Sequence, residues 1–561
     1  MMIAQPSAKY PAFAPIRLKD RTWPDNVIDK APRWLSSDLR DGNQALIEPM
    51  NIEQKLRMFD LLIECGFKEI EVAFPSASDT EFTFVRRLIE ENRIPEDVTI
   101  QVLTQSREDL IVRTFEALKG CKQAIVHVYN ATSPTFRRVV FNKTKEEVIA
   151  LAEYGVSLLV KEAAKYPETD WTFEYSPEIF SDTEVDFAVE VCEAVMKIAN
   201  PTPEKPIIFN LPATVEVATP NVYADQIEYF CRNISRRDSV IVSIHTHNDR
   251  GCAVAATELA LMAGGDRVEG CLFGHGERTG NVDIITVALN MYTQGVDPEL
   301  NFSQINKVVR EVEHCTAIKV HPRHPYAGEL VFTAFSGSHQ DAIRKGLSDM
   351  KNQPDQMWKI PYLPVDPHDL GRSYEAVIRV NSQSGKGGIT YLLEEDHGIN
   401  MPRRLQIEFS RTVQAEADAK GIEVTSPMIF DLFNREYLTK GNVVIGQPIS
   451  IVEDENGNTE ISAVITTATQ QYHAKGHGNG PIAALVNALN ETLKIDVDVV
   501  SYHEHARSQG SKAEAVAFVE MQVESRTLFG VAIHANTARA SIDAVISALN
   551  RAIAKGWVEV K

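Results

Sequence analysis

The sequence predicts an α/β chain that begins with a TIM (β/α)8 barrel. Eight apolar runs of strand length recur at intervals in the first half of the chain. Segments with the 3.6-residue period of an amphipathic helix lie between them, and the eight strand-helix units together span about 270 residues, which is the count and length of such a barrel. The alternative is a doubly wound open sheet. After the barrel we expect a helical linker subdomain and a C-terminal α+β domain.

The eight runs share Val, Ile, Phe and other residues that favour strands. They are expected at Trp34–Asp41, Glu69–Phe74, Val98–Leu103, Ala124–Tyr129, Trp171–Tyr175, Pro206–Leu211, Val242–Asp249 and Val268–Phe273. Helical periodicity between the runs is clearest at Ile52–Cys65, Lys145–Tyr166 and Ala253–Ala263.

The length and composition restrict the class of protein. A chain of 561 residues is too long for one core, and we expect an N-terminal extension (1–30), the barrel (31–305), helical linker subdomains (306–434) and a C-terminal domain (435–561). The formal charge of -20 argues against nucleic acid or an anionic membrane as the main partner.

Nothing in the sequence directs the chain to a membrane or to secretion. It has no apolar run of membrane-spanning length, and the N-terminus lacks the apolar region of a secretory signal. The seven cysteines form no Cys-x-x-Cys pair, and we interpret them as reduced thiols of a cytoplasmic protein.

Polar residues follow the apolar runs at the edge where TIM barrels carry their chemistry. In the seventh run, His245 and His247 face the same side because side chains alternate along a strand. With Asp41 after the first run and Asn281 after the eighth, they offer two nitrogens and two oxygens to a divalent metal. The alternative for a His-x-His pair by itself is a hydrogen-bonded structural pair.

Three more residues at the expected barrel mouth have both a structural and a functional interpretation. Arg40 is either a salt-bridge partner or a fixed guanidinium for a carboxylate or an oxyanion. Thr214 is either a helix cap or a donor to a substrate carboxylate. Glu178 is either a solvated loop acid or a proton acceptor.

The glycine-rich segment from Gly274 to Gly280 lacks the lysine spacing of a phosphate-binding loop. We interpret it as a tight turn that brings polar side chains to the metal site.

The last part of the chain repeats one pattern of elements. Three expected strands (Ile449–Glu453, Ile461–Thr466 and Gln470–Lys475) precede a helix at Pro481–Leu493, and three more (Val499–His505, Glu514–Val523 and Thr527–His534) precede a helix at Ala538–Ile553. These are two βββα units. They form either an oligomerisation module or an effector site.

Long motifs in register give the chain a resemblance to a known family. Ser37–Gln44, His245–Asp249, Gly274–Asn281, Ser336–Ala342 and Tyr374–Gly388 resemble the signatures of the 2-isopropylmalate synthases. These enzymes condense acetyl-CoA with 2-oxoisovalerate and hydrolyse the thioester, giving 2-isopropylmalate and CoA, and leucine inhibits them. The resemblance covers nearly the whole chain.

The resemblance implies roles for individual residues. Asp41, His245 and His247 bind a divalent metal (Mg, Mn or Zn), Asn281 lies near it, and a monovalent cation such as K⁺ is an optional addition. Arg40 stabilises the alkoxide, and Thr214 holds the substrate carboxylate. The proposed base is His339, which the partner subunit of a homodimer supplies in the family and which Glu178 assists. Tyr374 matches a family tyrosine.

Substrate choice is expected to depend on the pocket near the metal. Its candidate lining residues are Leu103, His127, Tyr129, Ser176 and Thr214. An apolar Leu103 suits an isopropyl group, whereas the γ-carboxylate of a homocitrate synthase substrate would require a cation, and the pyruvate of a citramalate synthase would leave a void. A non-catalytic amino-acid sensor is the alternative from a different class of protein.

Leucine is expected to bind the two βββα units. The candidate contacts are Asn479, Gly480 and Ala483 in one unit and Tyr502, Ala506 and Ala513 around the other. Small residues there leave room for an isobutyl group, and the helix beginning at Pro481 offers free backbone N–H groups to a carboxylate.

Overall fold

The computed structural model of the chain describes residues 5–10, 12–353, 357–372, 386–420, 424–439, 441–453, 455, 457–508, 510 and 513–560. It divides the chain into two units. The first consists of Met1–Val331 with Pro367–Arg372, and the second of Phe332–Asp366 with Ser373–Lys561.

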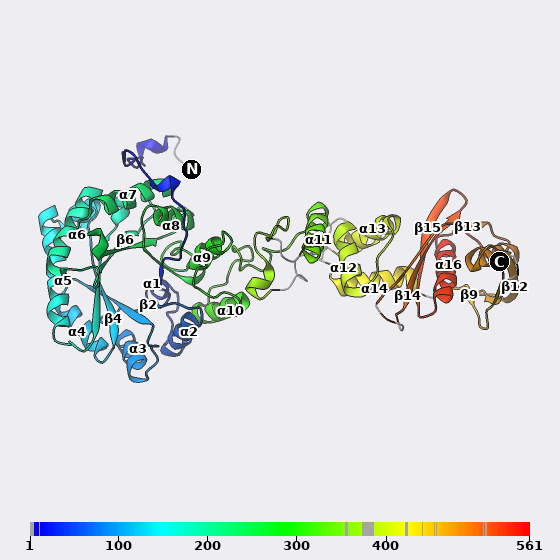
Figure 1. Ribbon diagram of the computed structural model, residues 1–561, viewed down its shortest axis with the longest axis horizontal. Coiled ribbons are helices and arrows are strands. Elements are labelled where there is room, and N and C mark those ends of the chain that lie inside the picture. Colours follow the sequence, from blue (N-terminus) through cyan, green and yellow to red (C-terminus); the bar gives the residue numbers. More distant parts are fainter. Residues whose placement is uncertain are drawn as a thin grey trace. The chain divides into compact units, whose positions relative to one another are not determined.

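In the first unit, eight parallel strands pair in sequence order and close into a barrel (Figure 1). The strands are β1 (Arg33–Ser36), β2 (Glu69–Ala73), β3 (Thr99–Gln105), β4 (Gln123–Ala131), β5 (Asp170–Glu178), β6 (Ile207–Ala213), β7 (Val240–Thr246) and β8 (Arg267–Gly270). Closure comes from β1 pairing with β8, where Trp34 aligns with Val268. The predicted barrel and its eight strands are confirmed.

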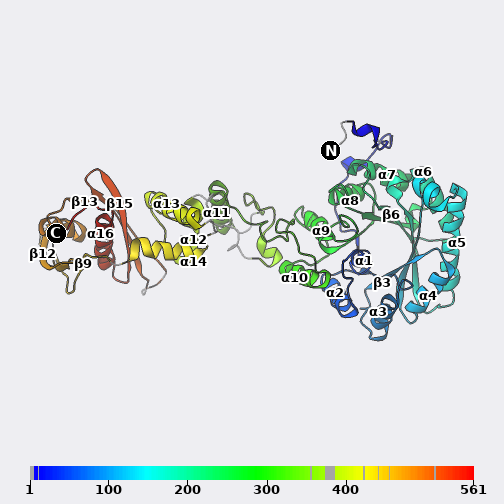
Figure 2. The same ribbon diagram turned by 180° about the vertical axis from the view of Figure 1, so that it is seen from behind.

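Helices surround this barrel, as Figure 2 shows from behind. They are α1 (Asp41–Gln44), α2 (Ile52–Glu64), α3 (Asp79–Glu90), α4 (Glu108–Leu118), α5 (Lys145–Ala163), α6 (Val185–Ala199), α7 (Pro220–Asn233), α8 (Ala253–Met262), α9 (Ile284–Tyr292) and α10 (Ile305–Thr316). Short 3₁₀ or π-helical turns are η1 (Pro6–Ala8), η2 (Trp23–Asp25), η3 (Phe136–Phe141), η4 (Phe180–Asp182), η5 (Arg237–Ser239), η6 (Leu272–Gly274) and η7 (Pro367–Leu370). Each strand-helix unit returns the chain to the same end of the barrel.

The first strand is shorter than the sequence suggests. It ends at Ser36, because the backbone N–H groups of Arg40 and Gly42 both turn back to the carbonyl of Ser37. Asp41 is therefore the first residue of α1, and Arg40 lies in the turn before it. This turn carries both side chains to the barrel mouth.

The N-terminal segment packs on the outside of the barrel. Arg21 forms an ion pair of 2.7 Å with Asp225 of α7, and the indole N–H of Trp23 donates to the same carboxylate at 2.8 Å. Trp23 is buried by this contact.

The second unit begins with helices. They are α11 (Gly337–Asn352), α12 (Lys386–His397), α13 (Arg403–Lys420) and α14 (Ser426–Phe433), followed by the π-helical turn η9 (Asn434–Leu438). An apolar core joins α12, α13 and α14 to one face of β14 and β15 through residues such as Phe409, Phe433, Phe518 and Phe529.

The chain then forms two antiparallel sheets, each followed by a helix. The first contains β9 (Val444–Ile445), β10 (Ser450–Glu453), β11 (Thr459–Thr466) and β12 (Gln471–Gly478) and precedes α15 (Pro481–Leu493). The second contains β13 (Val497–Ala506), β14 (Ala515–Val523) and β15 (Arg526–His534) and precedes α16 (Thr537–Ala554). The two expected βββα units are thus confirmed, and β9 is an additional short strand.

The two βββα units also resemble each other in how closely the helix packs on the last strand of its sheet. A Cβ on Gly476 of β12 would lie 2.2 Å from the carbonyl oxygen of Ala484 in α15. A Cβ on Gly530 of β15 would lie at the same distance from the carbonyl oxygen of Ala544 in α16. In both units a glycine lets the helix approach the last strand closely, and one apolar core lies between the sheets and helices.

All seven cysteines are free thiols. In the described part of the chain, none of the helices combines the length and hydropathy that a membrane span requires. The domain limits expected from the sequence stay predictions.

Candidate active site

A pocket of about 310 Å³ lies at the carboxyl ends of the barrel strands. All eight strands, or the segments that directly follow them, contribute side chains to it, and the glycine-rich turn is the segment after β8. The lining residues are Arg40, Asp41, Gln44, Phe74, Leu103, His127, Tyr129, Ser176, Glu178, Asn210, Pro212, Thr214, His245, His247, Glu277 and Arg278. Except for Asn281, His339 and Tyr374, the pocket brings together every residue that the sequence placed at the barrel mouth.

Asp41, His245 and His247 form a compact, buried cluster. The Oδ2 atom of Asp41 lies 3.3 Å from Nε2 of His245 and 3.7 Å from Nε2 of His247. The two imidazole rings are stacked with centroids 5.3 Å apart. Asn281 is buried beside them, with its Oδ1 2.9 Å from Nε2 of His245.

The donor atoms of this cluster fit a divalent metal. Nδ1 of His245 lies 3.2 Å from Oε2 of Glu269, so that Nδ1 carries the proton when the ring is neutral and the lone pair of Nε2 faces Asp41. A carboxylate that orients a histidine in this way is typical of metal sites. Oδ2 of Asp41 is buried and has no hydrogen-bond partner among the described residues.

The electrostatics of the cluster are strongly coupled. Burial raises the pKa of Asp41, but the charge of Arg40 and the two histidines outweigh burial and hold that pKa well below its usual range. Burial lowers the pKa of His245, but Asp41 and Glu269 overcome this and raise it to about 10. Burial and the charge of His245 lower the pKa of His247 to about 4. A cation, whether proton or metal, is therefore favoured between Asp41 and Glu269.

Further charged residues lie beneath the cluster, inside the barrel. Arg267 is completely buried and contacts Glu174, Glu269 and Glu69. Burial and the charge of Glu269 raise the pKa of Glu174 well above its usual range.

Arg40 pairs with the buried carboxylates of Asp41 and Glu71, and Arg267 pairs with that of Glu269. Buried charges are stable only when they are paired, and these ion pairs hold the carboxylates in place around the two histidines.

Arg40 is held by two carboxylates. Its Nη1 lies 3.0 Å from Oδ1 of Asp41, and its Nη2 lies 2.8 Å from Oε2 of Glu71. Nε is buried and has no hydrogen-bond partner among the described residues. The fixed guanidinium therefore keeps donor capacity for a ligand in the pocket.

Thr214 and Glu178 lie close together at the pocket wall. The hydroxyl oxygen of Thr214 accepts a hydrogen bond of 3.0 Å from the backbone N–H of Ile179, which leaves its own O–H free to donate. Burial raises the pKa of Glu178, whereas Arg40 lowers it less strongly. Glu178 is thus a stronger base than an exposed glutamate.

His127 and Ser176 form a hydrogen-bonded pair on neighbouring strands, with Oγ of Ser176 2.7 Å from Nε2 of His127. Nδ1 of His127 lies 3.3 Å from Oε1 of Glu174, and burial lowers the pKa of His127. The lowered pKa favours a neutral ring, in which one of the two nitrogens is free to accept a hydrogen bond.

Leu103 and Tyr129 complete the wall between these groups. Leu103 is buried, and the Oη of Tyr129 accepts a hydrogen bond of 3.3 Å from Nε2 of Gln105. Burial raises the pKa of Tyr129, which therefore stays a neutral phenol.

The glycine-rich segment is a tight turn, as expected. Gly280 has φ +95°, and a Cβ at this position would lie 1.8 Å from the carbonyl oxygen of Gly274. The turn aligns Asn281 with His247, which directly follows β7, through an isolated antiparallel bridge. It places Glu277 and Arg278 at the pocket rim, where Arg278 pairs with Asp249 at 2.6 Å.

Sequence reasoning did not single out several of these residues. It assigned no role to the buried charges Glu69, Glu71, Glu174, Arg267 and Glu269, or to the pocket residues Gln44, Phe74, Asn210, Pro212, Glu277 and Arg278. The buried set carries a usable signal, because a charged residue within an apolar barrel strand must point into the barrel or lie at its end.

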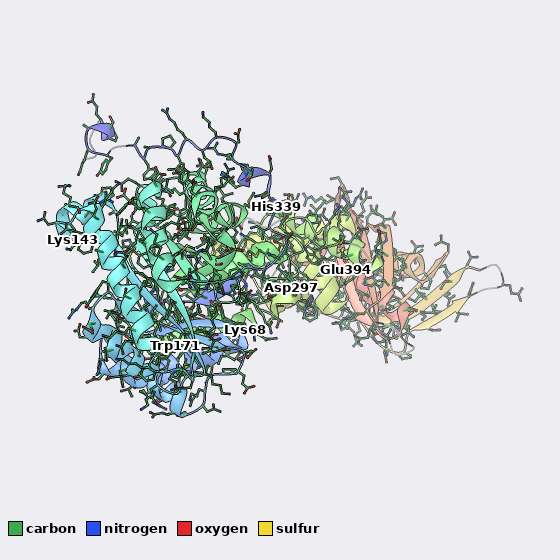
Figure 3. All side chains as sticks on the ribbon, turned by 60° about the vertical axis from the view of Figure 1, so that its left-hand side comes forward. Lys68, Lys143, Trp171, Asp297, His339 and Glu394 are labelled. Atoms are coloured by element: carbon green, nitrogen blue, oxygen red, sulfur yellow. The ribbon has the colours of Figure 1, made fainter. Side chains whose placement is uncertain are left out.

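His339 belongs to the second unit. It lies on α11, and Figure 3 labels the residue. Its side chain is exposed, and its ring stacks on Tyr362 with centroids 4.0 Å apart. Tyr374 lies outside the described residues.

The expected effector residues fall at two places in the second unit. Asn479 and Gly480 connect β12 to α15, and Ala483 is in the first turn of that helix. Tyr502 and Ala506 are on β13, where the Tyr502 hydroxyl lies 2.8 Å from Oγ of Ser541 in α16. Ala513 precedes β14, and its N–H donates to the carbonyl of Gly510.

Comparison with known families gives the class of this barrel. Residues 31–312 match the HMGL-like family, residues 329–394 match the alpha-isopropylmalate synthase, post-catalytic domain-like family, and residues 423–553 match the LeuA allosteric (dimerisation) domain. The HMGL-like family is metal-dependent, in agreement with the candidate metal-binding group of Asp41, His245 and His247.

Curated relatives are similar over almost the full chain. The 2-isopropylmalate synthase of Pseudomonas fluorescens (strain SBW25) is 60% identical over 558 residues, covering 99% of both chains. That of Pseudomonas savastanoi pv. phaseolicola is 59% identical over 555 residues, also covering 99% of both. The chain belongs to the 2-isopropylmalate synthase family, a family of acyltransferases. The resemblance seen in the sequence is therefore confirmed.

Proposed function

We propose that the protein catalyses the first committed step of leucine biosynthesis, in which acetyl-CoA and 2-oxoisovalerate give 2-isopropylmalate and CoA. The observation that carries the proposal is the convergence of Asp41, His245 and His247 beside Arg40. These four residues line one pocket of the barrel. The chain that carries them is 60% identical to a 2-isopropylmalate synthase.

The 2-oxo acid would bind through its carboxylate and keto groups. Asp41, His245 and His247 would hold a divalent metal, Mg, Mn or Zn, with Asn281 beside them. When bound, this ion polarises the keto group as a Lewis acid. The hydroxyl of Thr214 donates to the substrate carboxylate, since its oxygen already accepts from a backbone N–H and its proton is free.

Arg40 stabilises the oxygen that becomes negative during condensation. The new carbon-carbon bond forms when the acetyl methyl carbon attacks the keto carbon, and the keto oxygen becomes an alkoxide. Because Asp41 and Glu71 fix the guanidinium before the reaction, no reorganisation is needed as this charge develops.

A base must first remove a proton from the acetyl methyl group, which is a very weak acid. Glu178 is at the pocket wall with a pKa raised by burial, and it acts with His339, supplied by the helical subdomain of a partner subunit. Hydrolysis of the thioester by water then releases CoA. The match to the LeuA dimerisation domain supports a homodimer.

The pocket wall favours a branched aliphatic side chain. Leu103 is buried and apolar, so it suits the isopropyl group of 2-oxoisovalerate. The cationic side chains at the pocket, Arg40 and Arg278, are each already paired with carboxylates. A second substrate carboxylate would therefore have to compete with these ion pairs.

The test is release of CoA from acetyl-CoA with a panel of 2-oxo acids. The specificity constant should be highest for 2-oxoisovalerate, and each missing methylene should cost about 10- to 200-fold. A preference for pyruvate would move the assignment to citramalate synthase, and a preference for 2-oxoglutarate to homocitrate synthase. No turnover with any acid, combined with leucine binding, would indicate a sensor.

We also propose that leucine inhibits the enzyme by binding the two βββα units, and that the protein acts in the cytoplasm. The α15 N-terminus, with Gly480 before it and Ala483 in its first turn, offers unpaired backbone N–H groups for the carboxylate. The LeuA allosteric domain match over residues 423–553 supports this regulation.

A further inference from the structure

A second buried cluster of metal-ligating side chains lies behind the active site. It consists of Asp38, from the turn after β1, and Cys271 and His275, from the segment after β8. One ligand atom from each residue lies within 4.8 Å of the others, and all three residues are buried. None of the three lines the active-site pocket.

The histidine of this cluster presents a free lone pair to its neighbours. Nδ1 of His275 lies 3.0 Å from the carbonyl oxygen of Leu272. A carbonyl can only accept, so Nδ1 carries the proton and Nε2 of the neutral ring does not. Nε2 is buried, has no hydrogen-bond partner among the described residues, and lies 3.4 Å from Oδ1 of Asp38. Histidines that bind metals are held by a carbonyl in the same way.

The carboxylate is also fixed before any ligand binds. The Ser36 hydroxyl donates to Oδ2 of Asp38 at 2.6 Å, and the backbone N–H of Leu272 donates to Oδ1 at 3.1 Å. Each carboxylate oxygen can accept more than one bond, so Oδ1 still has a lone pair for a cation.

The backbone leaves space for the cluster at one position. A Cβ on Gly42 would lie 2.5 Å from Nε2 of His275 and 3.1 Å from Sγ of Cys271. Any other residue at this position would push the imidazole and the thiol away. The glycine thus allows both ligand atoms to meet beside Asp38.

We propose that Asp38, Cys271 and His275 form a second metal site, for a thiophilic divalent cation of the zinc class. One thiolate, one carboxylate and one neutral imidazole are ligands that zinc and cobalt prefer, whereas magnesium prefers oxygen alone. The thiolate and the carboxylate balance the charge of the ion, which makes the buried site neutral. The site is structural, because the cluster does not reach the pocket.

The second site would act on the first through one side chain. Nδ2 of Asn281 donates to Sγ of Cys271 at 3.5 Å, while Oδ1 of the same amide lies 2.9 Å from Nε2 of His245. A thiolate accepts a stronger hydrogen bond than a thiol. A cation at the second site would therefore fix the amide of Asn281 and, with it, the glycine-rich turn.

Cobalt spectroscopy separates the two sites without an activity assay. The first site contains no sulfur ligand, so a thiolate-to-cobalt charge-transfer band in the near ultraviolet reports on the second site alone. The full-length protein is freed of metal with a chelator, loaded with Co²⁺, and its cobalt content per chain is measured with its spectrum.

The variants are Cys271→Ser and His275→Asn, with Cys252→Ser as a matched control. Cys252 is a partly exposed thiol outside the cluster, so its loss tests for adventitious thiol binding. Asp41→Asn removes a ligand of the first site only. His275→Asn keeps Cys271 in place, so this variant can still test the site if Cys271→Ser fails to fold.

The wild type is expected to bind two cobalt ions per chain and to show the band. Cys271→Ser and His275→Asn should each bind one ion without the band, Cys252→Ser should behave like the wild type, and Asp41→Asn should lose one ion but keep the band. One ion without a band in the wild type would overturn the proposal and indicate that Asp38 and His275 are a buried hydrogen-bonded pair. A band that survives both cluster variants would overturn it as well.

Discussion

Replacing Arg40 by lysine tests the role of the guanidinium most directly. The side chain is about 10% exposed and spans two carboxylates, with 3.0 Å to Asp41 and 2.8 Å to Glu71. A lysine keeps the positive charge but has a single ammonium group instead of a planar fork. It can pair with one carboxylate or approach the substrate oxygen, but it cannot do both from a fixed position.

The size of the effect follows from the number of donors lost. Losing one preorganised donor to a developing oxyanion costs about 10²–10³ in kcat, or roughly 2.7–4 kcal/mol of transition-state stabilisation. One of the two buried carboxylates also loses a hydrogen bond, which should lower the free energy of unfolding by about 1–3 kcal/mol. The stability cost alone would leave kcat of the folded enzyme unchanged.

The assay measures kcat and KM for both substrates, together with chemical denaturation. Arg278→Lys is the matched control, since Arg278 is at the rim of the same pocket and also pairs with a carboxylate, Asp249. It should lose much less of kcat than Arg40→Lys. If Arg40→Lys changed only the KM for acetyl-CoA, or if both variants lost kcat equally, the role assigned to Arg40 would be wrong.

Three other predictions concern the metal, the base and the effector. Asp41→Ala or His245→Ala should abolish divalent metal binding, measured by calorimetry, and turnover, while the circular dichroism spectrum stays native; near-wild-type activity of either variant would refute the metal site. Because burial raises the pKa of Glu178, kcat should fall as the pH drops through that raised value, above the ordinary value of about 4.3; Glu178→Gln should be slower and lack this acid limb, and an unchanged pH profile would exclude Glu178 as the base. Ala513→Phe should weaken leucine inhibition without changing kcat in the absence of leucine. The variant should lose the coupling energy between the leucine site and the active site, which is typically about 1–3 kcal/mol. Full inhibition of this variant would place the leucine site elsewhere.

The barrel could be predicted from sequence because its signals are local. Each strand is a short apolar run, such as Ile207–Ala213, in which every residue is buried, and the order of the strands follows the order of the chain. The His-x-His pair needs no tertiary information either, since alternation along one strand puts both rings on one face. The long motifs identified the family, and the resemblance to that family implied the roles of Arg40 and Thr214.

The charges inside the barrel could not be predicted in the same way. Glu174 and Glu269 lie 95 residues apart in the sequence, yet both contact Arg267. Which of them holds a proton depends on burial and on the distances among several charges, and a sequence motif contains neither. The pairing of Asp38 with His275 is of the same kind, because Gly42 sets how closely the two segments approach.

The sequence by itself thus determined the elements, their order, and the ligand types that meet at the barrel mouth. Only the tertiary structure decided which side chain orients which. His245 meets Glu269 because β7 and β8 align these two residues side by side. The physical reason is that electrostatic interactions in a low-dielectric interior depend on distance and on burial, and both are fixed only when strands distant in the chain have closed into one barrel.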